Sequence, residues 1–259
     1  MIAAIVQARF GSSRLPGKVL LPLCGKPVLA HVCERVQAAR SVDTVTVATT
    51  MEREDNAIEE FCRTQQIAVF RGPKDDVLRR YTSALAWIEE TRGMVDYVVR
   101  ITADCPLMDP AVIDAAVDIA QERGFGYVSN VDPPTFPDGV DVEVIRKDIL
   151  VRADTTAHLP SDREHVTPSI RRDEHVMKWN ITMTPDLSAE RWTLDTPQDY
   201  RFLSEVCRHL SQKGGYSVEE VRAVLQRYPE LRAINAGIPR NTGYRLSLEN
   251  DPTGRGEKT

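Results

Sequence analysis

A basic, glycine-containing loop near the N-terminus is the segment best suited to carry chemistry. It follows the apolar run IAAIV (2–6) and has the sequence QARFGSSRLPGK over residues 7–18. Glycines and small hydroxylated residues let a backbone approach a ligand closely, and Arg9, Arg14 and Lys18 add three cations. This combination predicts a polyphosphate site in which N–H and hydroxyl groups donate and the cations neutralise charge. An ordinary basic surface loop is the alternative, and the glycine spacing matches neither a P-loop nor a dinucleotide fingerprint.

Two aspartates that follow apolar segments are the candidate metal ligands. Asp104 comes just after the run VVRI (98–101), and Asp195 comes directly after WTL (192–194). A carboxylate at the carboxyl end of a strand projects into the ligand crevice of an α/β sheet. Carboxylate and phosphate oxygens together suit Mg²⁺, so we predict a shared Mg²⁺ at Asp104 and Asp195. The alternatives are that Asp195 caps the following helix and that Asp104 is a turn residue.

The elements that must position these residues alternate along the first 130 residues. Strands are predicted from short apolar or β-branched runs at 2–6, 44–49, 67–70 and 97–101. Helices are predicted from amphipathic stretches at 28–39, 55–65, 76–88 and 110–121. Short joints between these elements predict a doubly wound, mostly parallel α/β sheet covered on both faces, with ligands at the carboxyl ends of its strands.

The alternation stops between residues 127 and 183. Within this segment VDVEV (140–144) alternates like a half-exposed antiparallel strand. We expect an inserted β-rich arm over 127–183 that covers the site or makes a dimer contact. The main domain is expected to span 1–210, followed by a helical extension over 211–249 and a disordered tail over 250–259.

Composition limits the class of protein. The 259 residues include 42% hydrophobic residues, enough for a core, but no stretch long enough to span a bilayer, and the start has no secretory signal. A net charge of −5 argues against nucleic acid as a partner. Five scattered cysteines without a C-x-x-C pair predict reduced thiols in a cytoplasmic protein and no structural zinc site.

Several motifs in order along the chain resemble cytidylyltransferases that make CMP-activated acidic sugars, such as Kdo and sialic acid. The resemblance is strongest to the spore-coat-polysaccharide, SpsF-like branch of that group. It covers roughly residues 1–210 and rests on the basic loop and on RGPKDDVL (71–78), ITADCPL (101–107), FPDGVDVE (136–143), REHVTP (163–168) and TLDTPQDY (193–200). It implies a Rossmann-like nucleotidyltransferase fold, related to that of GT-A glycosyltransferases.

The resemblance also implies a role for each matching position. The nucleotide site for CTP would include Ala8, Arg9, Gly11, Ser12, Ser13, Arg14, Lys18, Arg71 and Asp104. Arg71 would lie near the cytosine, with an ordinary surface charge as the alternative. The implied reaction is attack of a substrate hydroxyl on the α-phosphate, with release of pyrophosphate. Its catalytic residues would be Arg14, Lys18, Asp104 and Asp195, the two aspartates holding Mg²⁺.

The expected acceptor site draws on two further motifs. It would include Asp138, Asp141, Glu143 and His165. A tight turn would explain Asp138 equally well, and a hydrogen-bonded structural role would explain His165. Kdo enzymes carry an acidic residue after the first aspartate, whereas this chain has Cys105, which leaves the identity of the sugar open.

The sequence therefore predicts a cytoplasmic, Mg²⁺-dependent cytidylyltransferase. Its expected partners are CTP and an acidic sugar used for a surface polysaccharide, with no nucleic acid or membrane partner, and a homodimer is expected. A glycosyltransferase of similar fold would usually carry D-x-D, but residues 104–106 are DCP. A non-catalytic nucleotide-binding protein is the second alternative, and the joint presence of Arg14, Lys18, Asp104 and Asp195 argues against it.

Overall fold

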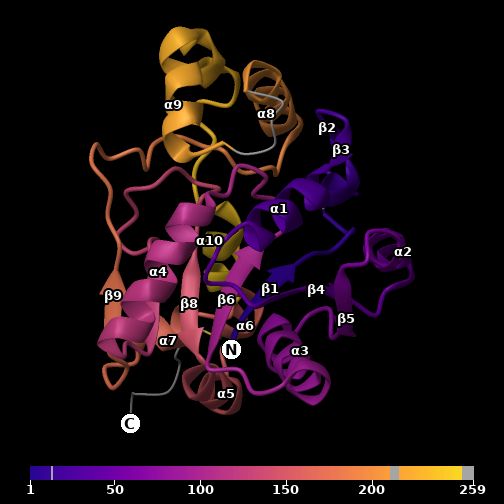
Figure 1. Cartoon of the computed structure of the whole chain (residues 1–259), viewed down its shortest axis with the longest axis vertical. Helices are drawn as coiled ribbons and strands as arrows, with labels where there is room; N and C mark the ends of the chain where they lie inside the picture. The colour runs from indigo at the N-terminus through magenta and orange to yellow at the C-terminus, as the bar shows by residue number, and fades with distance from the viewer. Residues whose placement is uncertain (13, 211–215, 253–259) are drawn as a thin grey trace.

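A seven-stranded sheet with helices on both faces forms the centre of the computed structural model, which describes residues 1–12, 14–210 and 216–252 (Figure 1). The strand order is β5-β4-β1-β6-β8-β7-β9. All neighbouring pairs are parallel except those that β8 makes with β6 and β7. The prediction of a doubly wound, mostly parallel sheet is confirmed.

The parallel half of the sheet explains why distant segments meet. Its strands are β1 (Ile2–Gln7), β4 (Thr44–Thr50), β5 (Ala68–Gly72) and β6 (Tyr97–Thr102). Gln7, the last residue of β1, pairs with Ala48 on one side and Thr102 on the other. Because parallel strands end at the same edge, the basic loop after β1 emerges beside Asp104, which follows β6.

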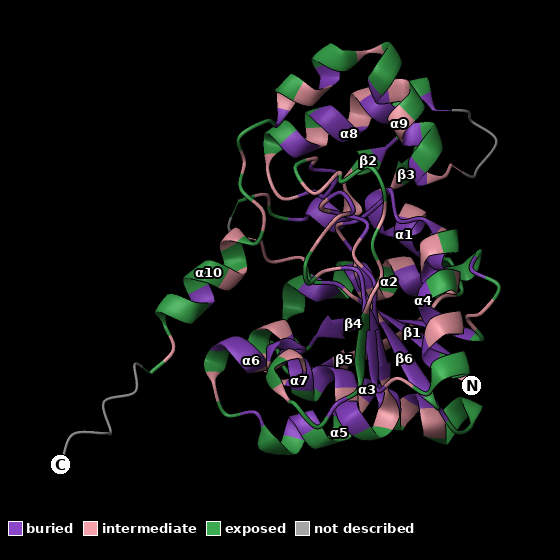
Figure 2. Ribbon diagram, turned by 90° about the vertical axis from the view of Figure 1, so that its left-hand side faces the viewer, coloured by how far each residue is buried: buried purple, intermediate pink, exposed green. Residues whose placement is uncertain are grey.

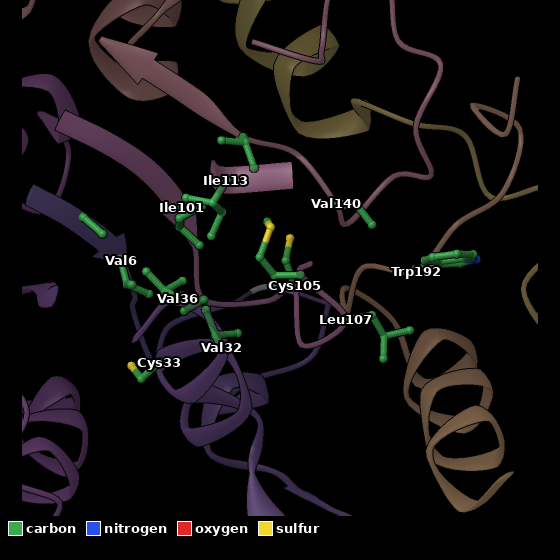
Figure 3. Close-up of a cluster of buried hydrophobic side chains, with 14 of the residues drawn as sticks. Val6, Val32, Cys33, Val36, Ile101, Cys105, Leu107, Ile113, Val140 and Trp192 are labelled. Carbon is green, nitrogen blue, oxygen red and sulfur yellow. The ribbon is translucent and has the colours of Figure 1, made fainter. Parts of the chain in front are cut away.

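Alternate residues of β1 pack into two separate apolar clusters on the two faces of the sheet. Ala4 and Val6 belong to one apolar cluster, and Ala3 and Ile5 belong to the other, as expected for successive side chains of a buried strand. Figure 3 shows part of the first cluster, in which Val6 lies with side chains of the neighbouring strand and helix. The covering helices of this half are α1 (Val28–Gln37), α2 (Asn56–Thr64), α3 (Val77–Arg92) and α4 (Pro110–Arg123).

Segment 127–183 extends the main sheet instead of forming a separate β-rich arm. Its strands are β7 (Tyr127–Ser129), β8 (Glu143–Arg146) and β9 (Lys178–Asn180). Most of the segment between β8 and β9 is helical, in α5 (Lys147–Thr156), α6 (Pro160–His165) and α7 (Pro168–Arg172). β8 is antiparallel as predicted but buried, because α4 and α5 contact it, so the expectation of a half-exposed strand is wrong.

The C-terminal part of the chain contains three longer helices. They are α8 (Pro197–His209), α9 (Val218–Arg227) and α10 (Thr242–Glu249), with the 3-10 helix η3 (Pro229–Ile234) before α10. A capping box at Ser217 and Glu220 starts α9, as their spacing predicts. α10 lies apart from α8 and α9 and contacts α6 (Figure 2). Of the predicted disordered tail, 250–252 lie in the described part and 253–259 lie outside it.

A small hairpin supports the end of the basic loop. It follows η1 (Lys18–Leu20) and consists of β2 (Pro22–Leu23) and β3 (Lys26–Pro27). β2 packs against α8, and Cys24 forms a disulfide with Cys207. The expectation of reduced thiols is therefore wrong for this pair, since sequence spacing does not show that the hairpin and α8 are neighbours. Cys33, Cys62 and Cys105 are free and buried.

Candidate active site

Lys18 lies between the two candidate metal-binding aspartates. Its Nζ donates to Asp104 Oδ2 at 2.6 Å and to Asp195 Oδ1 at 2.7 Å, and its side chain is only 11% exposed. Burial acts to lower the pKa of Lys18, but the two carboxylates outweigh it and raise the pKa. Lys18 is therefore a cation throughout the physiological pH range. The structure thus brings three widely separated parts of the chain to one point.

Gly17 is the residue that lets the loop deliver Lys18 to this position. Its φ is +70°, and a Cβ there would lie 2.9 Å from the ring of Phe10. The loop closes on itself because Gly17 N donates to Phe10 O at 2.8 Å and Lys18 N donates to Leu15 O at 3.2 Å. A side chain at position 17 would therefore strain the backbone and displace Phe10.

Asp104 is held by the backbone at the end of β6. Its carbonyl oxygen accepts from Leu194 N at 2.9 Å, which ties the two aspartate-bearing segments together. Burial acts to raise the pKa of Asp104, but Lys18 outweighs it and lowers the pKa to about 2. Asp104 is therefore ionised and available as a cation ligand at neutral pH.

Asp195 is surrounded by cations. Its carboxylate accepts from Arg191 at 2.9 Å and lies 3.0 Å from an Arg14 nitrogen, in addition to its contact with Lys18. The residue that caps α8 is Thr196, whose hydroxyl accepts from Asp199 N. The alternative of Asp195 as the helix cap is therefore wrong, and its side chain faces the cleft residues instead.

Arg191 is the main site residue that sequence reasoning missed. It is buried and pairs with Asp138 at 2.7 Å and with Asp199 at 2.9 Å, besides Asp195. Burial acts to lower the pKa of Arg191, but these carboxylates outweigh it and raise the pKa, so Arg191 is a positive charge next to both Asp138 and Asp195. A charged residue directly before the apolar WTL run, four positions before Asp195, was the available signal.

A cleft with two chambers opens around the aspartates. The larger chamber has a volume of about 530 Å³ and the smaller about 270 Å³. The predicted residues that line the larger chamber are Ala8, Arg9, Ser12, Arg14, Lys18, Asp104 and Asp195. The predicted acceptor residues Asp138, Asp141, Glu143 and His165 all line the smaller one. Arg14, Asp104 and Asp195 line both, so they lie where two bound substrates would meet.

The carboxylates of the smaller chamber already have partners. Glu143 pairs with Arg100 and accepts from the Tyr127 hydroxyl at 2.5 Å, and Asp138 pairs with Arg191. Asp141 pairs with Arg240, although burial raises its pKa to about 7. These contacts mean that the acidic residues shape the chamber more than they offer free negative charge.

His165 has the contacts of a positioned, neutral side chain. Its Nε2 lies 3.0 Å from Ser247 Oγ, and its ring meets the ring of Tyr244 edge to face at 5.0 Å between centroids. Burial lowers the pKa of His165 below its usual value. Its place in the chamber lining is therefore compatible with either a substrate contact or a structural role.

Arg171 differs from the other cations of the smaller chamber. Five arginines line the smaller chamber. All of them except Arg171 pair with a carboxylate at 3.0 Å or less, namely Arg14, Arg100, Arg191 and Arg240. The carboxylate recorded with Arg171 is that of Asp132, at 4.0 Å. Its buried Nε has no hydrogen-bond partner among the described residues. Arg171 is therefore the cation that this chamber leaves open to an incoming anion.

Arg71 stands away from the cleft. Its guanidinium donates to Thr50 O and Glu52 O at 2.8 Å each, to Asn56 Oδ1 at 2.7 Å and to Glu59 Oε2 at 2.5 Å. It lines neither chamber in the described part of the chain. The structure therefore gives Arg71 a role in joining β4, β5 and α2, and these contacts favour a structural role over the expected place near a nucleobase.

We expect Arg71→Ala to lower the free energy of unfolding by about 1–3 kcal/mol, because several charge-assisted hydrogen bonds are lost. Denaturant unfolding checks this, and the KM for CTP is expected to stay within about twofold of the parent value. A large rise in the KM for CTP, with an unchanged free energy of unfolding, would instead show that Arg71 contributes to nucleotide binding.

Two other predicted loop residues need separate mention. Gly11 is not among the residues described as lining either chamber, and a Cβ there would overlap the carboxylate of Glu54. Ser13 lies outside the described residues. By contrast Gln7, which was not predicted, lines the larger chamber with a buried Oε1 that has no partner among the described atoms.

The aspartate pair has the chemistry of a two-carboxylate Mg²⁺ site. Asp104 and Asp195 already contact one shared cation, the ammonium group of Lys18. The described residues contain no cluster of three or more His, Cys, Asp or Glu side chains that could hold a metal alone. Mg²⁺ commonly uses one or two carboxylates and completes its shell with substrate phosphates and water. The donor set therefore fits Mg²⁺ bound together with a nucleotide.

Comparisons with known proteins agree with this geometry. A family model described as cytidylyltransferase matches residues 3–232. The chain is 29% identical over 237 residues to the spore coat polysaccharide biosynthesis protein SpsF of Bacillus subtilis, covering 88% of this chain and 95% of that protein. A 3-deoxy-manno-octulosonate cytidylyltransferase of Anaeromyxobacter dehalogenans is 38% identical over 123 residues, which is 48% of each chain. A solved cytidylyltransferase structure from Leptospira borgpetersenii superposes with a TM-score of 0.85 at 30% identity, covering 92% of this chain and 99% of that one.

Proposed function

Starting from the fact that this chain belongs to the cytidylyltransferase family and is a nucleotidyltransferase, we propose that it transfers CMP from CTP to a hydroxyl of an acidic sugar and releases pyrophosphate. The observation that carries the proposal is Lys18, whose Nζ contacts both Asp104 and Asp195 where the two chambers join. This point has a basic loop on one side and the acceptor chamber on the other.

The larger chamber supplies the groups that a triphosphate requires. Arg9, Arg14 and Lys18 line it and oppose the negative charge of the phosphates. The oxygen of the acceptor hydroxyl bonds to the α-phosphorus while the bond to the leaving pyrophosphate breaks and the hydroxyl proton passes to water, and charge builds up on the oxygens of both groups. Arg14 and Lys18 neutralise the leaving pyrophosphate, and the cleft walls align the reacting atoms.

Asp104 and Asp195 would hold Mg²⁺, with phosphate oxygens completing its coordination. When bound there, Mg²⁺ supplies polarisation of the α-phosphate and acidification of the attacking hydroxyl. Lys18 would then leave the carboxylates and could contact the phosphates. Its position between Asp104 and Asp195 offsets one of their two negative charges.

An acidic acceptor is supported by Arg171. Its guanidinium lines the smaller chamber, and the nearest recorded carboxylate is 4.0 Å away. The Nε of Arg171 is buried and has no hydrogen-bond partner among the described residues, and an incoming carboxylate would satisfy this donor through a charge-assisted hydrogen bond. The names of two relatives, which concern spore coat polysaccharide and 3-deoxy-manno-octulosonate, suggest the same substrate class.

The test of this function is a screen for pyrophosphate release. The full chain with Mg²⁺ is assayed with ATP, CTP, GTP and UTP, each against a panel of acidic sugars, with matched neutral sugars as controls. We expect release with CTP and at least one acidic sugar, and no release when the acid is replaced by its neutral counterpart. Turnover confined to another nucleotide or to neutral sugars would contradict the proposal.

We expect Arg171→Ala to raise the KM for the acidic acceptor by about 10- to 100-fold, the usual effect of losing a hydrogen bond to a charged group. The KM for CTP is expected to change by less than about twofold, because Arg171 does not line the larger chamber in the described structure. Arg172→Ala is the matched control, since Arg172 pairs with Asp162 at 2.7 Å and lines neither chamber. An unchanged acceptor KM in Arg171→Ala would show that Arg171 does not bind the acceptor.

Three features of the proposed biology stay predictions. They are a role in surface polysaccharide synthesis, a homodimeric state and a cytoplasmic location. The described residues contain no helix with the length and apolarity needed to cross a membrane.

A further inference from the structure

Residues of the C-terminal segment 239–251 line both chambers. The family model ends at residue 232, so this segment lies beyond it. α10 stands apart from the neighbouring C-terminal helices and beside α6, as Figure 2 shows. This segment therefore forms one wall of the cleft although it lies outside the region that the family model matches. The other walls of the cleft come from residues inside that region.

The segment divides its residues between the two chambers. Arg240, Asn241 and Tyr244 line the smaller chamber, whereas Leu246 and Ser247 line the larger one. Thr242 and Gly243 line both. The N-terminal part of the segment therefore faces the proposed acceptor, and the C-terminal part faces the proposed nucleotide.

Polar contacts dominate the attachment of the segment to α6. Ser247 donates to Glu164 Oε2 at 2.6 Å, and Asp251 accepts from Ser161 N at 2.9 Å and from Ser161 Oγ at 2.5 Å. The apolar side chain of Leu246 is 55% exposed and contributes little burial. Elements with few buried apolar contacts open locally at a low free-energy cost. The segment has the features of a lid that can lift.

Arg240 is the residue that ties this lid to the smaller chamber. Its guanidinium pairs with Asp141 and donates to Phe136 O at 3.0 Å, and its side chain is 14% exposed. Gly139, between these two partners, has φ +113°, and a Cβ there would lie 2.6 Å from Thr193 N. Arg240 therefore binds the loop that contains Gly139, and this loop packs directly against the segment leading to Asp195.

The lid also faces Arg171 of the smaller chamber. The ring centroid of Tyr244 lies 5.7 Å from the guanidinium carbon of Arg171. An acceptor bound through Arg171 would therefore be enclosed between Arg171 on α7 and Arg240 and Tyr244 on the lid. Enclosure of this kind excludes water and orients a bound hydroxyl.

We propose that residues 239–251 form an acceptor lid and that Arg240 is the positioning residue that sets acceptor specificity by closing this lid over the smaller chamber. This inference rests on the proposed function, since it assigns the lid to the acceptor of that reaction. It concerns acceptor binding through the N-terminal part of the segment, whose Arg240 lines only the smaller chamber.

The first experiment tests the lid without any acceptor. Amide hydrogen exchange is measured over 242–249 in the full chain and in Arg240→Ala. We expect about tenfold faster exchange in the variant, as the loss of a contact with a charged group implies. Leu248→Ser is the matched control, because Leu248 is on the same helix, 44% exposed, and lines neither chamber. Equal amide exchange rates over 242–249 in the parent and in Arg240→Ala would contradict the proposal that Arg240 holds a lid closed.

The second experiment measures the two substrates separately, using the acid that gives most turnover in the screen. Arg240→Ala is expected to raise the acceptor KM about tenfold while the KM for CTP stays within about twofold. Arg240→Lys, which keeps the charge, is expected to restore part of the acceptor KM. Unchanged acceptor KM in Arg240→Ala would overturn the assignment. If the parent shows no turnover at all, the proposed function fails, whereas the exchange experiment still decides the lid.

Discussion

Replacing Lys18 with alanine is expected to lower turnover with CTP by about 10³-fold, as when a preorganised group that stabilises developing charge is lost. Lys18 is the residue whose Nζ contacts both aspartates, at 2.6 and 2.7 Å, and it is held there by the left-handed Gly17. Lys26→Ala is the matched control, because Lys26 pairs with Glu34 and lines neither chamber. Pyrophosphate release at the parent rate by the Lys18 variant would contradict its proposed role.

The same variant offers a readout that does not depend on turnover. Without Lys18, Asp104 and Asp195 are left as two neighbouring carboxylates without their shared cation, which lowers stability in the absence of ligand. We therefore expect Mg²⁺ alone to raise the melting temperature of Lys18→Ala more than that of the parent, because a ligand that binds the folded state stabilises it. Equal Mg²⁺ effects in both proteins would show that the aspartates do not form a cation site.

Asp195→Asn is expected to reduce Mg²⁺-dependent turnover by at least about 10³-fold, since an amide of the same size removes one of the two carboxylate ligands. The change also removes the charge partner of Arg14 and Arg191, which adds a positive charge to the site. The measurement is the Mg²⁺ dependence of pyrophosphate release, with thermal unfolding to verify that the variant is folded.

Asp186→Asn is the control for this variant. Asp186 accepts from Ser188 N at 2.8 Å and lines neither chamber in the described structure. We expect the control to keep the parent's Mg²⁺ dependence. A Mg²⁺ midpoint and rate in Asp195→Asn equal to those of the parent would show that the carboxylate of Asp195 has no part in metal binding.

The parallel half of the fold was predictable because its signals are local and strong. Runs such as TVTVAT (44–49) are rich in β-branched residues and long enough to identify a strand. Once these strands are parallel, the loop after β1 and Asp104 after β6 must meet at one edge. The convergence of Lys18 and Asp104 follows from that topology, without any knowledge of side-chain contacts.

The remaining half was harder because its elements are short and covered on both sides. β7 and β9 have three residues each, too few for a periodic pattern, and β8 is buried between helices, so alternation did not reveal its environment. Segment 127–183 therefore suggested an inserted β-rich arm, whereas its strands extend the main sheet.

Pairings between distant residues were the other feature that the sequence did not reveal. Arg191 lies 53 residues from its partner Asp138, and Arg240 lies 99 residues from Asp141. No local spacing identifies such pairs, although each arginine forms part of the cleft wall. Arg71 illustrates the opposite case, since the motif suggested a ligand contact while its hydrogen bonds serve the fold.

The most direct test of the central claim is a crystal structure of the full chain with CTP and Mn²⁺, in which the metal is located by its anomalous signal. We expect one metal peak shared by Asp104 and Asp195, with the triphosphate along the basic loop and Lys18 moved onto a phosphate. A metal bound elsewhere, or CTP outside the larger chamber while Lys18 still links the two aspartates, would contradict a single nucleotide–metal centre at this point.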